Sequence, residues 1–486
     1  MKKGESNARG TSLVFKRLGH RKVFLSGERK FMASFDSSKL SYEYSALIRA
    51  RSEDDVRETL KLANKYKIPV TPRGTGTSLT GSASPVKGGW VLDVSLMKRI
   101  AIKKDKAMAI VQPGAVVSEI QKVSEKEGLF YPPDPSSLKY CTIGGNIACN
   151  AGGMRCAKYG VTRDFVLALE GFMPNGEKVS WGGEYKKFAT GYNIRDLWIG
   201  SEGTLGVVTK AVLRLIPKPD ARWTSVAAFN SEKKALQAVR ALLGEGLTPS
   251  ILEYLDEDSI YCAEEIAGVR LFKKVEGKPL LLIEFDGSAS ELKDSKRRLK
   301  AWAERWAIAV KSARSESEAE NLWEVRRKCS GAMYALGNAK LNEDIVVPLE
   351  NQIRFSESLK RLKRKWNLPM PTFGHAADGN LHVNIMFHRE IREECVRAEG
   401  AVQDLMETVV SLGGTISGEH GIGLAKSPFL RIARNTAEIS AMQAIKQALD
   451  PNGILNPGKV FEPYHVWKKT PVAIHLPWDK KPILKR

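Results

Sequence analysis

The feature that most limits how this chain of 486 residues can fold is a glycine-rich loop, Pro72–Gly81, between two predicted strands. A phosphate-binding P-loop needs the pattern G-x4-G-K-[ST], and a Rossmann nucleotide fold needs a helix directly after its glycines. The loop meets neither condition, because the next patterned segment, Gly89–Asp93, reads as another strand. Its backbone donors, its hydroxyl groups and Arg73 could hold a pyrophosphate. A plain glycine-rich connection would look similar, so the loop alone leaves both interpretations open.

Two further segments are too rich in glycine and asparagine to pack as a core by themselves. They are Thr142–Gly153 and Trp198–Val208. Such segments are typical of backbone that wraps around a large ligand with few side chains in the way. We therefore expect irregular structure over Thr142–Gly153. Regular elements are expected nearby: a helix that begins after Ser52 with an acidic first turn, and a hairpin around residues 174–177.

The composition changes after the Pro-Lys-Pro segment at residues 217–219. Beyond it, helix patterns such as residues 233–243 and 291–306 alternate with strand patterns such as 224–229 and 280–285. This alternation indicates an α+β domain, and we expect an antiparallel sheet with helices on one face.

A second constraint comes from a stretch that carries two histidines, Gly374–Asn384. It places His375 and His382 seven residues apart across a turn bounded by glycines. From His382 to Phe387 the residues alternate with a period of two, which predicts a strand. His382 and Asn384 should therefore point to the same face of that strand.

A carboxylate and a further imidazole follow on another glycine loop, as Glu419 and His420. Two histidines and one glutamate form a ligand set for a catalytic divalent metal with an open position. A spare histidine beside them could act as a general base. The alternative is that two of the histidines are structural residues at strand ends. Of the chain's seven histidines, four fall in this part of the sequence: His375, His382, His388 and His420.

The cysteines and the apolar runs exclude several classes of protein. The six cysteines contain no C-x2-C pair, which argues against a disulfide framework and against an iron–sulfur module in this chain. No apolar run is long enough to cross a bilayer, so we expect no transmembrane helix. The first residues lack the apolar segment of a secretion signal. From these features we expect a cytoplasmic protein.

Positive charge is concentrated at the two ends of the sequence. Residues 1–30 have a balance of +7 and residues 464–486 one of +5, out of a formal net charge of +21. The last segment also carries Trp467 and Trp478 among its lysines. This mixture suits an anionic membrane surface or an acidic partner subunit, and a tail that only raises solubility fits equally well. No nucleic-acid recognition motif accompanies the charge, and we expect residues 1–40 to be irregular.

Six motifs taken together resemble one family. The set is similar to the FAD-linked oxidases of the vanillyl-alcohol oxidase and p-cresol methylhydroxylase type. Within them it looks like the D-2-hydroxyacid dehydrogenase branch, with D-lactate dehydrogenase, D-2-hydroxyglutarate dehydrogenase and the FAD subunit of glycolate oxidase. The motifs span most of the sequence from about residue 42 to residue 463, and they are Pro72–Gly81, Pro132–Gly153, Ser201–Val207, Gly374–Asn384, Gly418–Gly423 and Asn452–Lys459.

The resemblance implies an α+β fold with two domains. One is a two-subdomain FAD-binding domain of the p-cresol methylhydroxylase type, and the other is a substrate or cap domain with an antiparallel sheet. The expected segments are a basic N-terminal segment at 1–40, the FAD-binding domain at 41–217, the substrate domain with the metal site at 218–418, a C-terminal segment that returns to the FAD domain at 419–463, and the basic tail with tryptophans at 464–486.

The resemblance also implies which residues surround FAD. The loop residues Arg73, Gly74, Thr75, Gly76, Thr77 and Ser78 would wrap the pyrophosphate. Members with a covalent flavin often carry a histidine in this loop, and its absence here implies a flavin bound non-covalently. The rest of the cofactor would be lined by Pro133, Asp134, Thr142, Gly144, Gly145, Asn146, Gly152, Gly160, Glu202, Gly206, Val207 and Asn456.

In relatives that hold a metal, the positions of His375, His382 and Glu419 provide its ligands. The resemblance therefore implies a divalent ion here, and zinc, manganese and iron all accept such a set. His420 would take the proton of the substrate hydroxyl, and Asn384 would help to place the substrate.

Two cationic residues are candidates for the substrate carboxylate. Arg326 stands where relatives hold that carboxylate, and a guanidinium suits a bidentate clamp. Lys340 is close to a second cationic position, but its spacing does not assign it.

The implied reaction is the oxidation of a small D-2-hydroxy acid, of the D-lactate, glycolate or D-2-hydroxyglutarate type, to the 2-oxo acid, with hydride passing to N5 of FAD. Electrons would leave to a separate acceptor: an iron–sulfur partner subunit, an electron-transfer flavoprotein or a quinone. The basic ends could contact that acceptor or the inner face of the membrane. The alternatives are a non-redox FAD enzyme of the alkyl-glycerone-phosphate synthase type and a non-catalytic FAD subunit that relays electrons.

Overall fold

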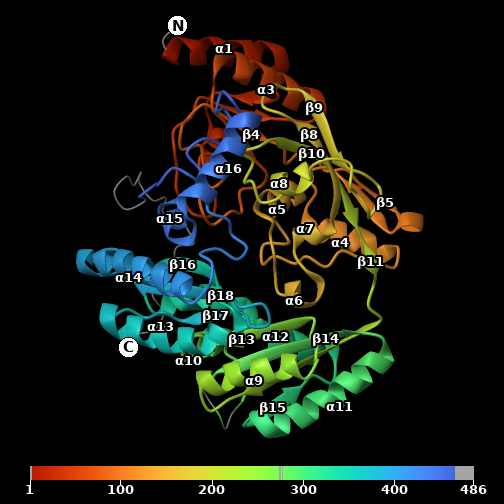
Figure 1. Cartoon of the computed structure of the whole chain (residues 1–486), viewed down its shortest axis with the longest axis vertical. Helices are drawn as coiled ribbons and strands as arrows, with labels where there is room; N and C mark the ends of the chain where they lie inside the picture. The colour runs from red at the N-terminus through yellow and green to blue at the C-terminus, as the bar shows by residue number, and fades with distance from the viewer. Residues whose placement is uncertain (1–2, 273–274, 276, 466–486) are drawn as a thin grey trace. The chain divides into compact units, whose positions relative to one another are not determined.

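A computed structural model describes residues 3–272, 275 and 277–465, and these residues form two compact units (Figure 1). Among the described residues, the first unit contains the chain up to Gly153, then Gly160–Lys218 and residues 419–465. The second unit contains Met154–Tyr159 and Pro219–Gly418. Of the basic tail expected at 464–486, the part from residue 466 lies outside the described residues.

The first sheet of the first unit is mostly parallel. A helix, α3 (Glu53–Tyr66), connects two of its strands, and it begins with the predicted cap, because the Ser52 side chain accepts from the backbone N–H of Asp55. The strand predicted at Gly89–Asp93 is confirmed as β4. In spatial order the strands are β1 (Val23–Phe24), β2 (Ala46–Arg49), β4 (Trp90–Asp93) and β3 (Val70–Arg73), with β2, β4 and β3 parallel.

Strand β3 has a second neighbour from far along the sequence. The backbone N–H of Val70 donates to Ile454 (2.7 Å), and that of Asn456 donates to Val70 (2.8 Å). Val70 and Leu455 form a parallel bridge, and both Ile454 and Leu455 are buried in the core that β3 shares with α3. The C-terminal residues of the first unit therefore lie beside the strand that leads into the glycine loop.

The second sheet of the first unit is antiparallel, and the hairpin predicted around residues 174–177 is confirmed as β8–β9. Its strands in spatial order are β5 (Ile100–Lys103), β6 (Met108–Val111), β10 (Val207–Arg214), β8 (Val166–Phe172) and β9 (Lys178–Gly182). The remaining elements of this unit include β7 (Leu129–Phe130), β11 (Ile216–Pro217), α4 (Val117–Lys126), α5 (Ile143–Cys149), α7 (Thr162–Phe165), α8 (Ile194–Trp198), α15 (Leu430–Ala433) and α16 (Thr436–Leu449).

Helix α5 shows that the irregular structure expected over Thr142–Gly153 is wrong for its first half. Ile143 and Ile147 are fully buried and anchor the helix. A side chain on Gly144 would place its Cβ 2.7 Å from Cβ of Pro113, so this glycine permits a close approach of two segments. The glycines here allow a short helix to pack tightly. Composition alone does not distinguish such a helix from a glycine-rich loop.

The irregular structure expected for residues 1–40 is also wrong, because a helix, α1 (Lys3–Leu18), packs against α3, and a short helix, α2 (Glu28–Met32), follows. Val14 is completely buried in the shared core. A Cβ on Gly10 would lie 2.4 Å from Cδ1 of Ile68, so the glycine leaves room for the Ile68 side chain against the helix. The indole N–H of Trp90 donates to the Thr11 hydroxyl (2.9 Å).

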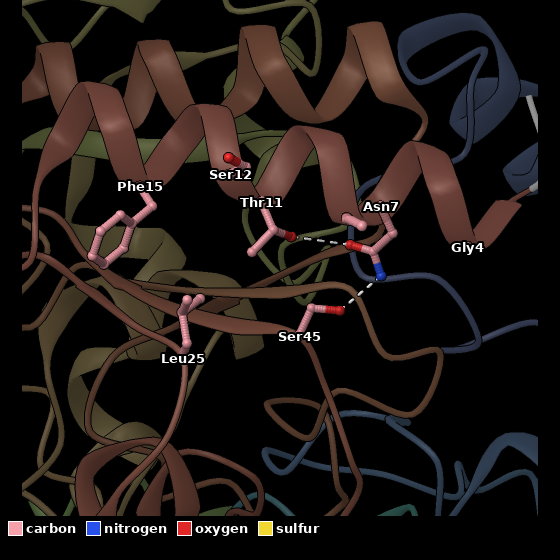
Figure 2. Close-up of a pocket in the computed structure, with 8 residues that line it drawn as sticks. Gly4, Asn7, Thr11, Ser12, Phe15, Leu25 and Ser45 are labelled. Atoms are coloured by element: carbon pink, nitrogen blue, oxygen red, sulfur yellow. Dashed lines mark hydrogen bonds between the residues drawn. The ribbon is translucent and has the colours of Figure 1, made fainter.

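A groove runs along α1 on the side that faces Leu25 and Ser45 (Figure 2). The Asn7 amide donates to the Ser45 hydroxyl (2.7 Å), and the Thr11 hydroxyl donates to Asn7 Oδ1 (3.3 Å). None of the residues that the sequence suggests for catalysis or binding lines this groove.

The second unit is built on one antiparallel sheet, as predicted. Its strands in spatial order are β15 (Ala309–Ser312), β12 (Ala221–Ala228), β14 (Leu280–Gly287), β13 (Ile251–Leu255), β17 (Thr372–His375), β18 (Asn380–Phe387) and β16 (Ala339–Val346). Its helices are α6 (Cys156–Tyr159), α9 (Glu232–Gly244), α10 (Glu257–Ala267), α11 (Ala289–Trp306), α12 (Glu316–Ala332), α13 (Gln352–Trp366) and α14 (Arg392–Ser411).

The expectation of helices on only one face of this sheet is wrong. Leu280 and Leu282 of β14 pack in one core with residues of α10 and α12. The alternate residues Leu281 and Ile283 are also fully buried. Because neighbouring residues of a strand point to opposite faces, the second face is covered as well, and α11 contacts β12 and β14.

The cysteines and the helices of the described residues bear on two expectations from composition. The six cysteines are all free. Among the helices that the structure describes, none combines the length and the apolar character needed to cross a lipid bilayer.

The packing of α1 can be tested with Val14→Ala. The substitution removes two buried methyl groups, so we expect the free energy of unfolding of the first unit to fall by about 2 kcal/mol. The exposed residue Lys16 on the same helix gives the control, Lys16→Ala, which should change little. Thermal unfolding followed by calorimetry measures both, and equal melting temperatures for the two variants would contradict the packing.

Candidate active site

Four neighbouring strands of the second unit carry polar side chains on one face. Strand β13 pairs Glu253 with His375 of β17. Strand β18 pairs His382 with Phe373 of β17 and with Asp344 of β16. Residues directly opposite in an antiparallel pair share a face, and so do residues two positions apart in one strand. Glu253, His375, His382 and Asp344 therefore all point to the same side of the sheet.

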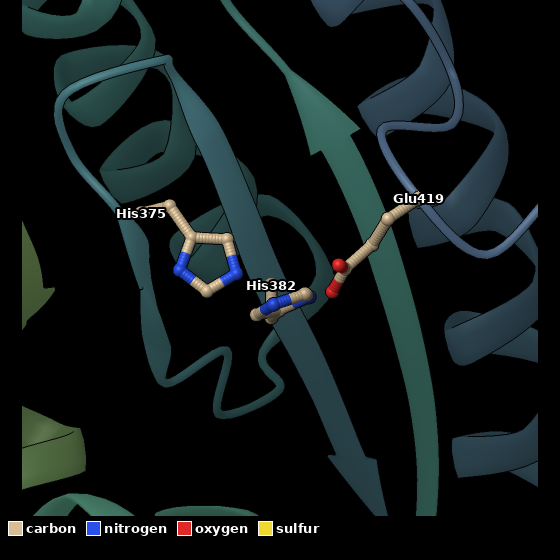
Figure 3. A group of neighbouring side chains, drawn as sticks. All are labelled: His375, His382 and Glu419. Atoms are coloured by element: carbon tan, nitrogen blue, oxygen red, sulfur yellow. The ribbon is translucent and has the colours of Figure 1, made fainter. Parts of the chain in front are cut away.

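His375, His382 and Glu419, the three residues proposed as metal ligands, lie near one another (Figure 3). One possible ligand atom from each of them lies within 4.8 Å of the others. The two imidazoles are buried, with ring centroids 5.5 Å apart and planes nearly perpendicular. The strand predicted from His382 onward is confirmed as β18, which begins at Asn380.

The position of Glu419 is set by the residue before it. Gly418 is the last residue of this stretch of the second unit, and its backbone N–H donates to the carboxylate of Asp344 (2.9 Å). Asp344 is fully buried, and it also accepts from the Ser417 hydroxyl (3.1 Å) and from the Asn380 amide (2.6 Å). Asp344 thus holds the turn that ends at Glu419, a role that the sequence analysis did not detect.

Glu253 is a second buried carboxylate that the sequence analysis missed. Its side chain has no exposed surface, it accepts a hydrogen bond from Nε of Arg326 (2.6 Å), and its other oxygen pairs with Nδ1 of His375. Burial raises the pKa of Glu253, but the charges of Arg326 and His375 more than offset this and hold the pKa at about 2. The Arg326 guanidinium also stacks over the Phe373 ring, 4.7 Å from its centroid.

The donor set fits a divalent metal ion. Since Nδ1 of His375 pairs with Glu253, Nε2 is the nitrogen that can serve as a ligand. Metal-binding histidines usually bind a carboxylate or a carbonyl through their other ring nitrogen, and His375 has this arrangement. Two imidazoles and one carboxylate also match the ligand types of catalytic zinc sites.

The other residues suggested for catalysis have defined surroundings. Asn384 is fully buried, and its amide nitrogen donates to the carbonyls of His382 (3.1 Å) and Pro371 (3.3 Å). Nε2 of His420 lies 3.8 Å from the carboxylate of Glu419. Lys340, which the sequence left unassigned, donates to the carbonyl and hydroxyl of Ser330 (both 2.8 Å). The substrate roles of Arg326, Asn384 and His420 stay predictions.

All of the residues predicted to bind FAD lie in the first unit, most of them in loops or at the ends of strands and some in the short helix α5. Arg73 ends β3, and Gly74–Ser78 follow it. Thr142 is the residue before α5, and Gly144–Asn146 lie in that helix. The others are placed as follows: Pro133 and Asp134 after β7, Gly152 after α5, Gly160 before α7, Glu202 and Gly206 between α8 and β10, Val207 at the start of β10, and Asn456 beside β3.

Several of these residues contact one another although they are far apart in sequence. The Asn456 amide donates to the carbonyls of Glu202 (2.7 Å) and Ser82 (2.8 Å). The Thr75 hydroxyl donates to the carbonyl of Tyr140 (2.8 Å). A Cβ on Gly74 would lie 2.3 Å from Oγ1 of Thr142. The glycine loop after β3, the start of α5 and the C-terminal residues therefore converge in one region of the first unit.

The side chains of Glu202 and Arg73 contact the backbone of loops in this region. The Glu202 carboxylate accepts from the backbone N–H groups of Ile422 (2.7 Å) and Gly423 (2.9 Å). Burial raises its pKa to about 7, although these two N–H groups oppose the shift. The Arg73 guanidinium lies under Gly76, where an added Cβ would collide with it. Burial lowers the pKa of Arg73, and nearby Asp36 acts in the opposite direction.

The region around Thr142 fits a ligand with polar oxygens. Its hydroxyl oxygen is buried and has no hydrogen-bond partner within the described part of the chain. A buried hydroxyl without a partner costs free energy, so such atoms are rare unless a ligand or water satisfies them. The orphaned hydroxyl next to Gly74 is therefore an observation of this fold that agrees with a cofactor site.

A mostly parallel sheet and an antiparallel sheet with glycine loops, followed by a unit built on one antiparallel sheet, define a class, the flavin-dependent oxidases of the p-cresol methylhydroxylase type. Models of known families agree with this class. Residues 44–182 match the FAD binding domain, and residues 218–460 match the C-terminal domain of FAD linked oxidases. The chain belongs to the FAD-linked oxidase family.

Curated relatives match most of the length of the chain. It is 37% identical to the glycolate oxidase subunit GlcD of Bacillus subtilis (strain 168), over 92% of this chain and 97% of that protein. It is 35% identical to a D-lactate dehydrogenase of Anaerostipes hadrus, over 85% of this chain and 89% of that protein.

Solved structures share the fold at lower sequence identity. p-Cresol methylhydroxylase with bound substrate gives a TM-score of 0.77 at 16% identity, covering 95% of this chain and 97% of that one. Alkyldihydroxyacetonephosphate synthase gives a TM-score of 0.72 at 18% identity, covering 92% and 85%. These two likenesses concern the fold alone.

Thr142→Val tests the cofactor region. Because the hydroxyl is buried without a partner, we expect its removal to leave the stability of the FAD-free protein unchanged or slightly higher. If FAD accepts or donates a hydrogen bond there, the dissociation constant of FAD should rise roughly tenfold, the equivalent of about 1.4 kcal/mol. Fluorescence titration of the FAD-free protein measures the constant.

Thr162→Val is the matched control, since its hydroxyl donates to the carbonyl of Ala151 (2.7 Å). It should lower stability and leave the FAD affinity unchanged. If Thr142→Val destabilises the protein as much as Thr162→Val and binds FAD normally, Thr142 has only a structural role.

Proposed function

We propose that this protein is a flavin-dependent dehydrogenase that oxidises a D-2-hydroxy acid to the 2-oxo acid. The observation that carries the proposal is the cluster of His375, His382 and Glu419 in a chain that also has a FAD-binding domain. Relatives named glycolate oxidase subunit and D-lactate dehydrogenase, at 34–37% identity over most of the chain, support this substrate class.

Each residue that we assign to the reaction has one task. His375, His382 and Glu419 would hold a divalent ion, and His420 would take the proton from the substrate hydroxyl. Arg326, with Nε bonded to Glu253, would bind the substrate carboxylate through its terminal nitrogens. Bound FAD would supply the hydride acceptor, and a bound ion would supply a Lewis acid that polarises the hydroxyl.

Residues of the first unit would hold FAD without a covalent bond. The loop Gly74–Ser78 contains no histidine, cysteine or tyrosine to which a flavin could be attached. Its glycines and hydroxyl groups suit a pyrophosphate bound through backbone N–H groups.

The non-redox alternative, an exchange reaction of the alkyl-glycerone-phosphate synthase type, has a structural neighbour in its favour. That neighbour is only 18% identical, whereas Glu419 next to His420 supplies the ligand and the base that a dehydrogenase needs. The electron-relay alternative would leave the buried His375–Glu253 pair without a chemical task.

The deciding experiment is anaerobic reduction of the bound flavin, followed by the loss of its visible absorbance. We expect one D-2-hydroxy acid of a panel of D and L acids to reduce the flavin rapidly, and the L acids to be inactive. Removal of the metal with a chelator should slow the reduction by at least a factor of about 100, which is about 2.7 kcal/mol of transition-state stabilisation.

Glu419→Gln should act like the chelator and should lower the metal content measured by elemental analysis. Flavin that no hydroxy acid reduces would refute the dehydrogenase and leave the exchange and relay functions. Reduction that neither the chelator nor Glu419→Gln affects would refute the metal site but keep the redox function.

The electrons must then pass to a separate acceptor, which we propose is a partner subunit with an iron–sulfur centre, a flavoprotein carrier or a quinone. The name of the relative from Bacillus subtilis describes a subunit, which agrees with a partner. The basic residues 464–486, most of which lie outside the described residues, are our candidate for contacting the acceptor or an anionic membrane near it.

Deletion of residues 464–486 tests this contact. The deletion removes a net charge of +5, so turnover with the natural acceptor should fall several-fold and should lose most of its dependence on salt. Turnover with a small artificial dye should stay unchanged, because the dye needs no docking surface. Equal rates with the natural acceptor before and after the deletion would contradict the proposal.

A further inference from the structure

We propose that Glu253 is a positioning residue that orients both the metal ligand His375 and the substrate clamp Arg326. The inference rests on the proposed function, and it assigns a role to a residue that the sequence motifs do not include. It also predicts that the site selects substrates by the spacing between their hydroxyl and carboxylate groups.

Glu253 lies at the centre of three separate elements of the second unit. It is the middle residue of β13, its partner Arg326 comes from α12, and its partner His375 ends β17. The Glu253 side chain has no exposed surface, and only 13% of the Arg326 side chain is exposed. A buried carboxylate between two such groups has little freedom to move, because either partner left alone would be a buried polar group without compensation.

The chemical effect on His375 follows from what a carboxylate can do. An ionised carboxylate only accepts hydrogen bonds, so Nδ1 of His375 must carry the hydrogen that points to Glu253. The lone pair is then on Nε2, the nitrogen left for the ion. Glu253 therefore selects the imidazole tautomer that can bind the metal and fixes the plane of the ring.

The effect on Arg326 concerns the substrate. The second oxygen of Glu253 accepts from Nε of Arg326, and the Phe373 ring supports the guanidinium plane. One rigid carboxylate thus connects the group that would bind the substrate carboxylate with a group that would bind the ion at the hydroxyl. A site built in this way has a fixed spacing between these two points, so it would favour the acids whose hydroxyl and carboxylate have that spacing, which under the proposed function are 2-hydroxy acids.

Glu253→Gln is the informative substitution. The amide keeps the shape, but it can satisfy Arg326 only with its oxygen, so its NH2 group must face His375. That arrangement favours the tautomer with the hydrogen on Nε2, which opposes metal binding. We expect the affinity for zinc, measured on the full FAD-loaded chain by competition with a chelator, to fall roughly 10- to 100-fold.

Two further effects are expected, and the second distinguishes positioning from a purely structural role. Activity of Glu253→Gln should recover in part as zinc is raised, because a weakened site fills at higher concentration. The preference for 2-hydroxy acids over 3-hydroxy acids, as a ratio of kcat/KM, should decrease, because the spacing between the two binding points is no longer fixed. A variant that had only lost stability could also recover with zinc, because metal binding stabilises the folded state, but it would keep the preference for 2-hydroxy acids.

Glu284→Gln is the matched control. Glu284 is also a buried glutamate of the same sheet, on the neighbouring strand β14, but it accepts from the Thr224 hydroxyl (2.9 Å) and the Trp323 indole (3.1 Å). Its substitution should change stability and leave zinc affinity at the level of the unchanged protein.

The outcomes separate the two proposals. If the unchanged protein binds no zinc and no other divalent ion, the proposed metal function fails, and the inference fails with it. If the unchanged protein binds zinc and Glu253→Gln binds it equally well, only the inference is overturned. Should Glu253→Gln fail to fold, nitrogen-15 NMR of histidine-labelled, zinc-loaded protein decides: a hydrogen on Nδ1 of His375 supports the inference, and a hydrogen on Nε2 overturns it.

Discussion

The alignment of four strands, β13, β17, β18 and β16, is the constraint on which the candidate metal site depends. Their backbone pairing sets Glu253 opposite His375 and Asp344 opposite His382. If one of these strands slipped by a single residue, its polar side chains would turn to the other face of the sheet. Apolar neighbours such as Phe373 and Met386, which lie on the same face, specify this alignment through their burial in the core with α10 and α12. Packing of ordinary core residues thus determines where the ligands lie.

Two buried carboxylates on the same face contact a candidate ligand or the turn beside one. Glu253 binds His375, and Asp344 binds the turn before Glu419. Burying a carboxylate is unfavourable unless it is paired or bonded, and each of these two has several partners. Such groups add little net stability, but they remove freedom from the side chains they contact. The two carboxylates therefore make the site rigid, because their main effect is to orient the groups they contact.

The parts of the structure that local sequence patterns determine were predicted correctly. The cap at Ser52, the antiparallel sheet of the second unit and the strand that contains His382 all follow from patterns within a few residues or from the alternation of helix and strand patterns. Helix α5 was missed because its glycines, which read as loop formers, permit close packing, as Gly144 does against Pro113. Helix α1 was missed because residues 1–40 were interpreted from their basic character, whereas burial of Val14 in a core with residues far along the chain stabilises the helix. Glu253 was missed because a single acid in an apolar strand carries no sign of its partners, which are 73 and 122 positions away.

The pairing of Val70 with Leu455 has a consequence for the order of assembly during synthesis. Strand β3 leaves the ribosome early, but the neighbour that covers its outer edge is made hundreds of residues later. The second unit, whose sheet draws all its strands from residues 221–387, can finish its core before that neighbour exists. During this time the outer edge of β3 in the nascent first unit stays unpaired. Such strand edges are prone to pair with the wrong segment. Mispairing of the β3 edge is therefore expected chiefly during the interval before residue 455 is translated.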